Sequence, residues 1–268
     1  EEAGDDFFCN NEALTFLNLP KLIKTGHRFF KANEMIEELN LPNLKEVGDE
    51  FLYYNKALKK IELQSLIKTG DSFLYKNNDI DELELVNLSD VGNEFLAFNN
   101  NIKKLNLPNL IKIKDGFLHH NKILSELNLP CLVKVGNRFL SNNESLAKIS
   151  LPSLKETGDY FLGNNEILNK VELPNLTRCG YCFLGRNLCL KYLELPKLIE
   201  AGDEFLSDNE ILEKLKLPEL VRAGKNFLNN DENLIELVLP KYTKFKGKVT
   251  KAIDIKLKKI NSKSIANL

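Results

Sequence analysis

The sequence is poor in the residues that build chemical sites: it has no tryptophan, one methionine and three histidines in 268 residues. This scarcity leaves little material for a metal or cofactor site. No apolar run approaches the length of about 18 residues that spans a membrane, and no charged-then-apolar leader precedes the first residues, so we expect neither a membrane span nor a signal peptide. The 37 Lys and Arg nearly balance the 38 Asp and Glu, for a net charge of −1. This balance argues against a uniformly basic nucleic-acid-binding protein.

The sequence instead contains an internal repeat with a fixed period of 22 residues. A strand-like motif, an apolar residue followed two positions later by leucine, begins at Leu17, Leu39, Ile61, Leu83, Leu105, Leu127, Ile149, Val171, Leu193, Leu215 and Leu237. Eleven of the 16 phenylalanines occupy one column of the repeat: Phe7, Phe29, Phe51, Phe73, Phe95, Phe117, Phe139, Phe161, Phe183, Phe205 and Phe227. A repeat of this length predicts a solenoid, in which each unit buries its apolar face against its neighbours.

The other columns of the repeat have structural roles. The apolar-x-Leu step is typical of a short strand that buries alternate side chains, and the proline that follows it in nine repeats ends the strand because it lacks an N–H. A glycine column that includes Gly26 predicts positive φ or close backbone approach. The Asp or Asn that often follows, such as Asp49, predicts the cap of a short helical turn carrying Phe-Leu. Asparagine recurs from Asn11 to Asn209, with Asp231 last, and we expect these side chains to bond the backbone of their own and the adjacent coil.

The repeat unit resembles the bacterial leucine-rich repeats of the BspA-like, or Treponema pallidum, class. The match is carried by residues 48–51 (Gly-Asp-Glu-Phe) and 55–63 (Asn-x-x-Leu-x-x-Ile-x-Leu) and by their equivalents over about 1–242. The resemblance implies an α/β leucine-rich-repeat right-handed solenoid, with a parallel β-sheet on the concave side and short helical turns on the convex side. The repeat spacing predicts about eleven 22-residue coils. It also implies a surface-exposed protein of a host-associated microbe that binds host or neighbouring-cell proteins and has no catalytic residues.

The predicted domain organisation is a solenoid over 1–242, which starts within a repeat, followed by a Lys-rich C-terminal cap or tail over 243–268. Because the sequence opens in mid-repeat without an initiator Met, we expect it to be a trimmed piece of a longer protein. Residues 241–268 contain nine lysines and one aspartate. The alternation of Ile253, Ile255 and Leu257 is typical of a strand that caps the last coil. The alternative is a basic tail that binds an anionic polymer.

Charged residues at the outward strand positions alternate in sign through the first half of the repeat array. Successive strands carry the pairs Glu37-Glu38, Lys59-Lys60, Asp81-Glu82 and Lys103-Lys104. At the roughly 5 Å spacing of neighbouring strands, opposite charges neutralise each other. We therefore expect a self-paired surface there rather than a docking site for a charged ligand. The alternation weakens at Lys170, Tyr192 and Lys214, where a partner would engage more easily.

The strongest candidate for a binding surface lies in the two positions after Phe-Leu, where adjacent repeats place six aromatic or imidazole rings along one edge. We call these residues the aromatic rim: Tyr53, Tyr54, Tyr75, Phe98, His119 and His120. Aromatic residues are enriched at recognition surfaces, so we predict that the rim contacts a partner. The alternative is that the rings cover the edge of the core or contact a neighbouring segment.

Other candidate sites are weaker. His119 and His120 are adjacent rather than four apart on a helix, which is a poor arrangement for metal binding. Cys179 and Cys182 have the spacing of a metal knuckle, but no second pair matches them. Cys179 replaces the Thr, Val or Ala of other repeats, which favours buried packing. We therefore expect no catalytic residue, no metal site and no cofactor.

The residues themselves support a non-catalytic protein-binding module. The family resemblance extends this expectation to the ectodomain of a bacterial surface or secreted adhesin, whose partner is a host or neighbouring-cell surface protein and not a nucleic acid. The alternative is an intracellular effector or scaffold repeat domain that lacks its partner domain.

Overall fold

The structure is a computed structural model that describes residues 1–231 and 233–247. The chain divides into two compact units, Glu1–Leu146 and Ala147–Leu268, and the described part of each is a parallel β-solenoid. Eleven three-residue strands, one in each coil of 22 residues, lie in the described residues. They coincide with the eleven apolar-x-Leu motifs, so the predicted solenoid is confirmed.

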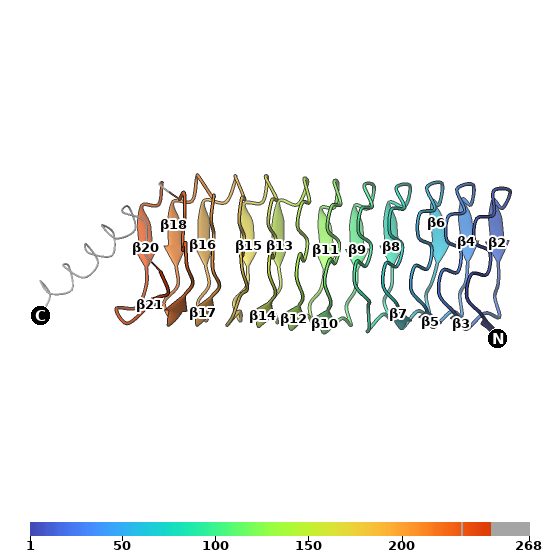
Figure 1. Ribbon diagram of the computed structural model, residues 1–268, viewed down its shortest axis with the longest axis horizontal. Helices are drawn as coiled ribbons and strands as arrows, with labels where there is room; N and C mark the ends of the chain where they lie inside the picture. Colours follow the sequence, from blue (N-terminus) through green and yellow to red (C-terminus); the bar gives the residue numbers. More distant parts are fainter. Residues whose placement is uncertain (232, 248–268) are drawn as a thin grey trace, which may run out of the picture. The chain divides into compact units, whose positions relative to one another are not determined.

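In the first unit, each coil contributes a three-residue strand, and all but the coil of residues 82–103 also contribute a two-residue strand on a separate wall (Figure 1). The three-residue strands are β2 (Phe16–Asn18), β4 (Glu38–Asn40), β6 (Lys60–Glu62), β8 (Glu82–Glu84), β9 (Lys104–Asn106) and β11 (Glu126–Asn128). The two-residue strands are β1 (Glu2–Ala3), β3 (Lys24–Thr25), β5 (Glu46–Val47), β7 (Lys68–Thr69), β10 (Lys112–Ile113) and β12 (Lys134–Val135). Paired strands are parallel and shifted by one repeat, so that Leu39 lies opposite Leu17 and Ile61.

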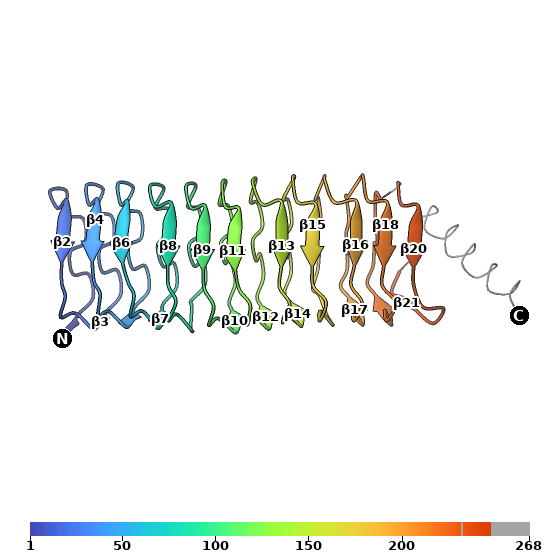
Figure 2. The same cartoon turned by 180° about the vertical axis from the view of Figure 1, so that it is seen from behind.

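The second unit repeats this arrangement (Figure 2). Its three-residue strands are β13 (Lys148–Ser150), β15 (Lys170–Glu172), β16 (Tyr192–Glu194), β18 (Lys214–Lys216) and β20 (Glu236–Val238). Its two-residue strands are β14 (Glu156–Thr157), β17 (Glu200–Ala201), β19 (Arg222–Ala223) and β21 (Lys244–Phe245). The pairings in this unit, such as Leu193 with Leu215, are again parallel and one repeat apart.

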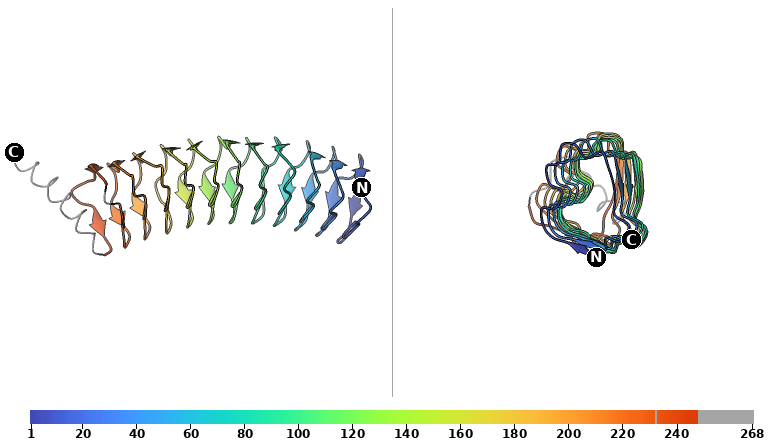
Figure 3. Two further views of the ribbon diagram at one scale, coloured as in Figure 1. Left: turned by 90° about the horizontal axis from the view of Figure 1, so that it is seen from above. Right: turned by 90° about the vertical axis from the view of Figure 1, so that its right-hand side faces the viewer.

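The interior of each unit is filled by the phenylalanine and leucine columns. Phe51, Phe73 and Phe95 are fully buried, and their rings stack nearly parallel with centroids 5.7 and 5.2 Å apart. In the second unit, Phe161 and Phe183 stack at 5.2 Å. The backbone of the coils winds around an interior (Figure 3). Buried side chains make this interior a continuous hydrophobic core in each unit, in which each buried phenylalanine contributes about 2 kcal/mol.

The predicted short helical turns are wrong, because the described residues contain no helix. In the segment that carries Phe-Leu, every second residue has positive φ, for example 56° at Glu50, 55° at Leu52 and 65° at Tyr54. Its N–H groups bond to other coils: Leu52 donates to the Phe29 carbonyl at 3.1 Å and Tyr54 to the Tyr75 carbonyl at 2.8 Å. A helix requires successive right-handed residues that bond within the segment. Accordingly, no helix in the described residues is long and apolar enough to cross a membrane.

The glycine column is explained by close backbone approach and not by positive φ. A Cβ on Gly48 would lie 2.6 Å from the carbonyl carbon of Gly26 in the preceding coil. Among the described glycines only Gly116 has positive φ, at 71°. It follows Lys114, which stands in the glycine column. Gly116 itself stands in the column of Glu50, where the other coils also have positive φ, so its conformation belongs to the segment that carries Phe-Leu.

The Asp and Asn residues after the glycine column bond the next coil and do not cap a helix. Asp49 Oδ1 accepts the N–H of Asp71 at 2.8 Å, and Asp71 Oδ1 accepts the N–H of Asn93 at 2.7 Å. The predicted helix cap is therefore wrong, since the side chain bonds a backbone donor one repeat away. The Asp and Asn side chains of this column thus form an inter-coil ladder, in which a side-chain oxygen accepts the backbone N–H of the equivalent residue in the following coil.

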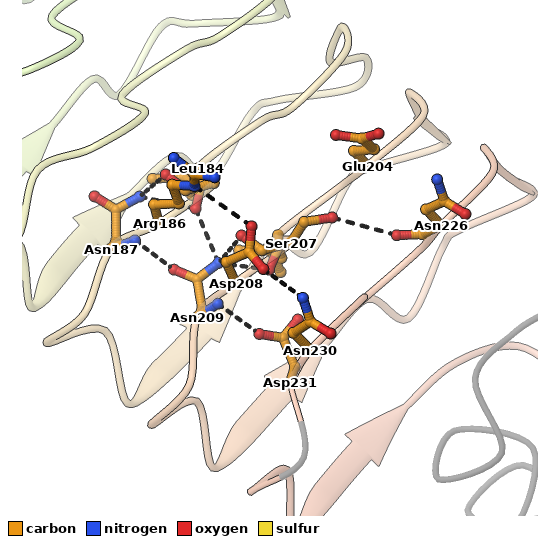
Figure 4. A network of polar contacts seen from close by, with 12 residues as sticks. Leu184, Arg186, Asn187, Glu204, Ser207, Asp208, Asn209, Asn226, Asn230 and Asp231 are labelled. Carbon is orange, nitrogen blue, oxygen red and sulfur yellow. Dashed lines mark hydrogen bonds and ion pairs between the residues drawn. The ribbon is translucent and has the colours of Figure 1, made fainter.

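The predicted asparagine ladder is confirmed. Asn55 is fully buried, accepts the N–H of Asn33 at 2.8 Å and donates to the carbonyl of Phe30 at 2.8 Å. Figure 4 shows the same ladder in the second unit, where the N–H of Asn209 donates to Asp231 Oδ1 at 2.7 Å. These bonds satisfy backbone groups that would otherwise be buried without a partner.

Replacing Asn121 by alanine should lower the free energy of unfolding by about 2–3 kcal/mol, because it removes partners from several buried groups. Asn121 Oδ1 accepts the N–H of Asn99 at 3.0 Å, and its Nδ2 donates to the carbonyl of Leu96 at 3.0 Å. Urea denaturation of the purified chain measures the change. Asn109→Ala is the matched control, since the exposed Asn109 bonds the Val86 carbonyl at 2.7 Å. Equal losses for both variants would contradict a burial-dependent ladder.

The chain after residue 242 begins as part of the solenoid. Strand β21 pairs with β19, and the ring of Phe245 packs edge-on against that of Phe227 at 5.5 Å. The predicted capping strand at Ile253, Ile255 and Leu257 lies outside the described residues. The proposed boundary between 1–242 and 243–268 therefore stays a prediction.

Candidate functional site

All six residues of the aromatic rim belong to the first unit and lie between its short strands. Tyr53 and Tyr54 follow β5, Tyr75 follows β7, Phe98 follows β8, and the two histidines follow β10. Each follows a Phe-Leu pair whose side chains are fully buried. The core therefore anchors the segment on which each rim residue stands.

The backbone holds rim residues of neighbouring coils at a fixed spacing. Tyr54, Phe98 and His120 have φ of 65°, 60° and 57°, a left-handed conformation that costs a non-glycine residue about 1–2 kcal/mol. Inter-coil hydrogen bonds stabilise it: the N–H of Tyr54 bonds the Tyr75 carbonyl at 2.8 Å and the N–H of Phe98 bonds the His119 carbonyl at 3.0 Å. The rings are thus attached to an ordered, hydrogen-bonded surface.

The structure brings the six rings into one continuous cluster. Tyr53 stacks on Tyr75 with centroids 4.9 Å apart and planes 1° from parallel. Tyr75 lies 5.2 Å from Phe98, and Phe98 stacks on His120 at 4.6 Å. Tyr54 joins through Tyr53 at 6.4 Å, and the edge of His119 packs against Phe98 at 4.8 Å.

The six rings differ in how much surface they offer. Tyr53, Tyr54, Tyr75 and Phe98 are half-buried, whereas His120 is exposed. His119 is only 6% exposed, and its Nε2 has no hydrogen-bond partner among the described residues. Burial, with the nearby His120 and Arg138, lowers the pKa of His119 to about 4, so its imidazole is neutral at pH 7. His119 therefore packs against Phe98 and His120 as a buried side chain and presents little surface to a partner.

Three lysines flank the rings, and sequence reasoning did not include them in the site. Lys31 lies 5.0 Å from the Tyr53 centroid and Lys56 lies 4.4 Å from the Tyr54 centroid. Lys76 lies 5.5 Å from the Tyr75 centroid and 5.6 Å from that of Phe98. The signal was present in the repeat, because Lys31 occupies the column of Tyr53 one coil earlier and Lys76 directly follows Tyr75.

The predicted self-pairing of the strand charges is confirmed for part of the first unit. Lys60 pairs with Glu38 at 2.7 Å, and Lys104 with Glu126 at 3.6 Å. Asp81, Glu82 and Lys103, however, form no ion pair with any residue that the structure describes. For Glu82, the neighbouring lysines Lys60 and Lys104 are engaged by other carboxylates. These pairs are largely exposed, so each contributes only about 0–1 kcal/mol.

The looser region predicted in the second unit is also compensated locally. Lys170 pairs with Glu172 of its own strand at 2.7 Å, and the Tyr192 hydroxyl hydrogen-bonds to Glu194. Lys214 lies opposite Tyr192 and 3.9 Å from Glu236. Tyr192 remains 44% exposed. Whether a partner engages this strand face stays a prediction.

The cysteines behave as separate side chains. Cys179 is 8% exposed, as predicted for an inward packing residue, and burial raises the pKa of its thiol to about 12. Cys182 is only half-buried. In the described part of the chain no group of three or more His, Cys, Asp or Glu residues could hold a metal ion.

Comparisons with known proteins place this geometry in a family. The profile of the BspA type Leucine rich repeat region matches six copies, over residues 1–124, 71–188 and 111–235. A leucine-rich repeat protein from Bacteroides ovatus is 19% identical and superposes with a TM-score of 0.68. The match covers 87% of this chain and 71% of the Bacteroides ovatus chain. This likeness shows the solenoid fold.

Two further solved structures have lower TM-scores. A leucine-rich repeat protein from Eubacterium ventriosum is 12% identical over 86% of this chain and 74% of its own, with a TM-score of 0.42. A leucine rich cell surface protein from Faecalibacterium prausnitzii is 11% identical over 89% of this chain and 88% of its own, with a TM-score of 0.30. No curated protein sequence matches the chain significantly.

Proposed function

We propose, on the premise that the chain belongs to the BspA-type leucine-rich repeat family, that it is a non-catalytic protein-binding module whose contact surface is the aromatic rim. The observation that carries the proposal is the continuous ring cluster on the first unit. Aromatic side chains supply large contact areas at low conformational cost and are enriched among the residues that dominate binding energy.

The finer part of the proposal is that the module belongs to a bacterial surface or secreted adhesin and binds a host or neighbouring-cell surface protein. Family membership supports this part. The rim supports the binding role by its position, because the half-buried rings stand on a hydrogen-bonded backbone and need little ordering when a partner docks.

The test is capture of extracellular-matrix and cell-surface proteins by the immobilised chain and by a rim variant. The chain itself supplies suitable replacements, since the same columns hold Ser141 and Asn142 one coil after the rim. The variant therefore combines Tyr53→Ser, Tyr54→Asn, Tyr75→Ser and Phe98→Asn, in which Asn tolerates positive φ better than other residues. We expect the parent to capture a partner and the variant to capture at least about thirtyfold less, which corresponds to the loss of one binding hot spot of about 2 kcal/mol.

A matched control changes the column of Tyr54 in the second unit, where rings are absent. The control combines Asn164→Ser, Asp208→Ser and Asn230→Ser, and we expect it to capture as much as the parent does. Thermal melting confirms that each variant is folded before use. Equal capture by the parent and the rim variant would refute the assignment of the rim, and capture by neither would refute the binding role in this extract.

A further inference from the structure

The faces of the rim rings are largely occupied by other groups of the protein. Tyr53 lies between Lys31 of the preceding coil, 5.0 Å from its centroid, and the parallel ring of Tyr75 at 4.9 Å. Phe98 has His120 stacked on it at 4.6 Å. A partner that stacks on ring faces, such as a sugar ring or a nucleobase, therefore finds few free faces. The ring edges remain, and the edge of an aromatic ring carries the positive part of its quadrupole.

The polar groups at these edges are donors. The hydroxyls of Tyr53 and Tyr75 have no hydrogen-bond partner among the residues that the structure describes. Burial, with the charge of Glu94, raises the pKa of the Tyr75 hydroxyl, which keeps its proton in place for donation. Each of these hydroxyls is available to an acceptor on a partner.

The lysines beside the rings are not equivalent. Lys31 pairs with Glu50, and Lys56 pairs with Glu34 at 3.3 Å. Lys76 forms no ion pair with any residue in 1–231 or 233–247, and it stands beside the rings of two adjacent coils, Tyr75 and Phe98. A partner carboxylate can therefore reach its ammonium without displacing one of the protein's own carboxylates.

One carboxylate opposes this local positive charge. Glu94 lies 3.8 Å from His119 Nε2, and a neutral imidazole does not compensate its charge. Arg138 acts electrostatically on both histidines and adds a cation at that end of the rim. The rim thus combines positive ring edges, free hydroxyl donors and a cation without a partner. It contrasts with the unit as a whole, in which 22 acidic residues outnumber 17 Lys and Arg.

We infer that the aromatic rim recognises an acidic, extended segment of a protein partner, through its ring edges, the hydroxyls of Tyr53 and Tyr75, and the ammonium of Lys76. This inference rests on the proposed function and specifies the chemistry of the partner. Glu94 acts against binding and makes affinity sensitive to the partner's charge.

The test is fluorescence anisotropy with three labelled peptides of equal length, in which glycine alternates with Glu, Gln or Lys. We expect the Glu peptide to bind and the other two to bind at least tenfold more weakly. Lys76→Gln should weaken binding of the Glu peptide about twofold to fivefold, and Glu94→Gln should strengthen it by a similar factor, as for exposed charge pairs. Lys45→Gln removes an exposed lysine away from the rim and should change nothing.

Each other outcome overturns the inference. Equal binding of the Glu and Gln peptides, binding that survives the rim variant, or unchanged affinity in both charge variants would each do so. Binding of a heparin fragment with no binding of the Glu peptide would assign the rim to a sulfated polysaccharide. If protein capture depends on the rim but not on Lys76 or Glu94, the proposed function stands and the acidic segment is refuted.

Discussion

Replacing Gly92 by alanine is expected to lower the free energy of unfolding by about 4 kcal/mol or more, the range reached by severe strain in a packed interior. A Cβ on Gly92 would overlap the carbonyl group of Gly70 and the amide nitrogen of Asp71. These atoms belong to the backbone of the preceding coil, so no side-chain rotation relieves the overlap. The coils would have to separate, and separation breaks the inter-coil hydrogen bonds along both walls.

Urea denaturation monitored by far-ultraviolet circular dichroism measures this loss. Gly163→Ala is the control, because a Cβ there would have no neighbour closer than 3.7 Å and φ is not positive. That variant should change stability by less than about 0.5 kcal/mol. If Gly92→Ala unfolds at the same urea concentration as the parent, close approach is not the reason for the glycine column.

Replacing Phe95 by alanine should cost about 3–5 kcal/mol, because it opens a cavity within the stacked column. The Phe95 ring is fully buried between Phe73 and Phe117, at centroid distances of 5.2 and 5.4 Å. In a solenoid each coil contacts only its neighbours, so the defect also weakens the coupling between the coils on either side.

The variants for this comparison are Phe95→Leu and Phe16→Ala. Leucine retains most of the buried volume and should recover much of the lost stability. Phe16 is 53% exposed on β2, and its replacement should cost less than about 1 kcal/mol. A cost for Phe95→Ala no greater than that for Phe16→Ala would show that the column does not stabilise the array.

The repeat made most of the fold predictable. The 22-residue spacing defined the strand in each coil, the buried phenylalanine column and the asparagine ladder, because each of these depends on a side chain that recurs at the same place. Asn55, for example, accepts the N–H of Asn33 and donates to the carbonyl of Phe30 at a fully buried site, and an amide side chain supplies both the acceptor and the donor.

The backbone conformation of the segment that carries Phe-Leu could not be predicted from the local sequence. Glu50, Leu52 and Tyr54 are ordinary residues with no intrinsic preference for positive φ, and Asp49 before them is a common helix cap. The conformation is set by hydrogen bonds to the neighbouring coils, which sequence patterns of a single coil do not reveal. The same limit applies at the rim, where the period placed the six rings together but did not predict the burial of His119.

The two side-chain ladders of the solenoid run in opposite directions. In the asparagine ladder the N–H of Asn33 bonds the Oδ1 of Asn55 in the following coil, whereas in the aspartate ladder the N–H of Asp71 bonds the Oδ1 of Asp49 in the preceding coil. A coil with Asn and Asp in these columns thus donates one hydrogen bond and accepts one hydrogen bond at each of its two faces. Genetic duplication or deletion of a DNA segment that encodes a whole coil with Asn and Asp in these columns therefore keeps both ladders in register, whereas an insertion that is not a whole number of coils shifts both out of register. The number of coils is free to vary during evolution while the length of each coil is not.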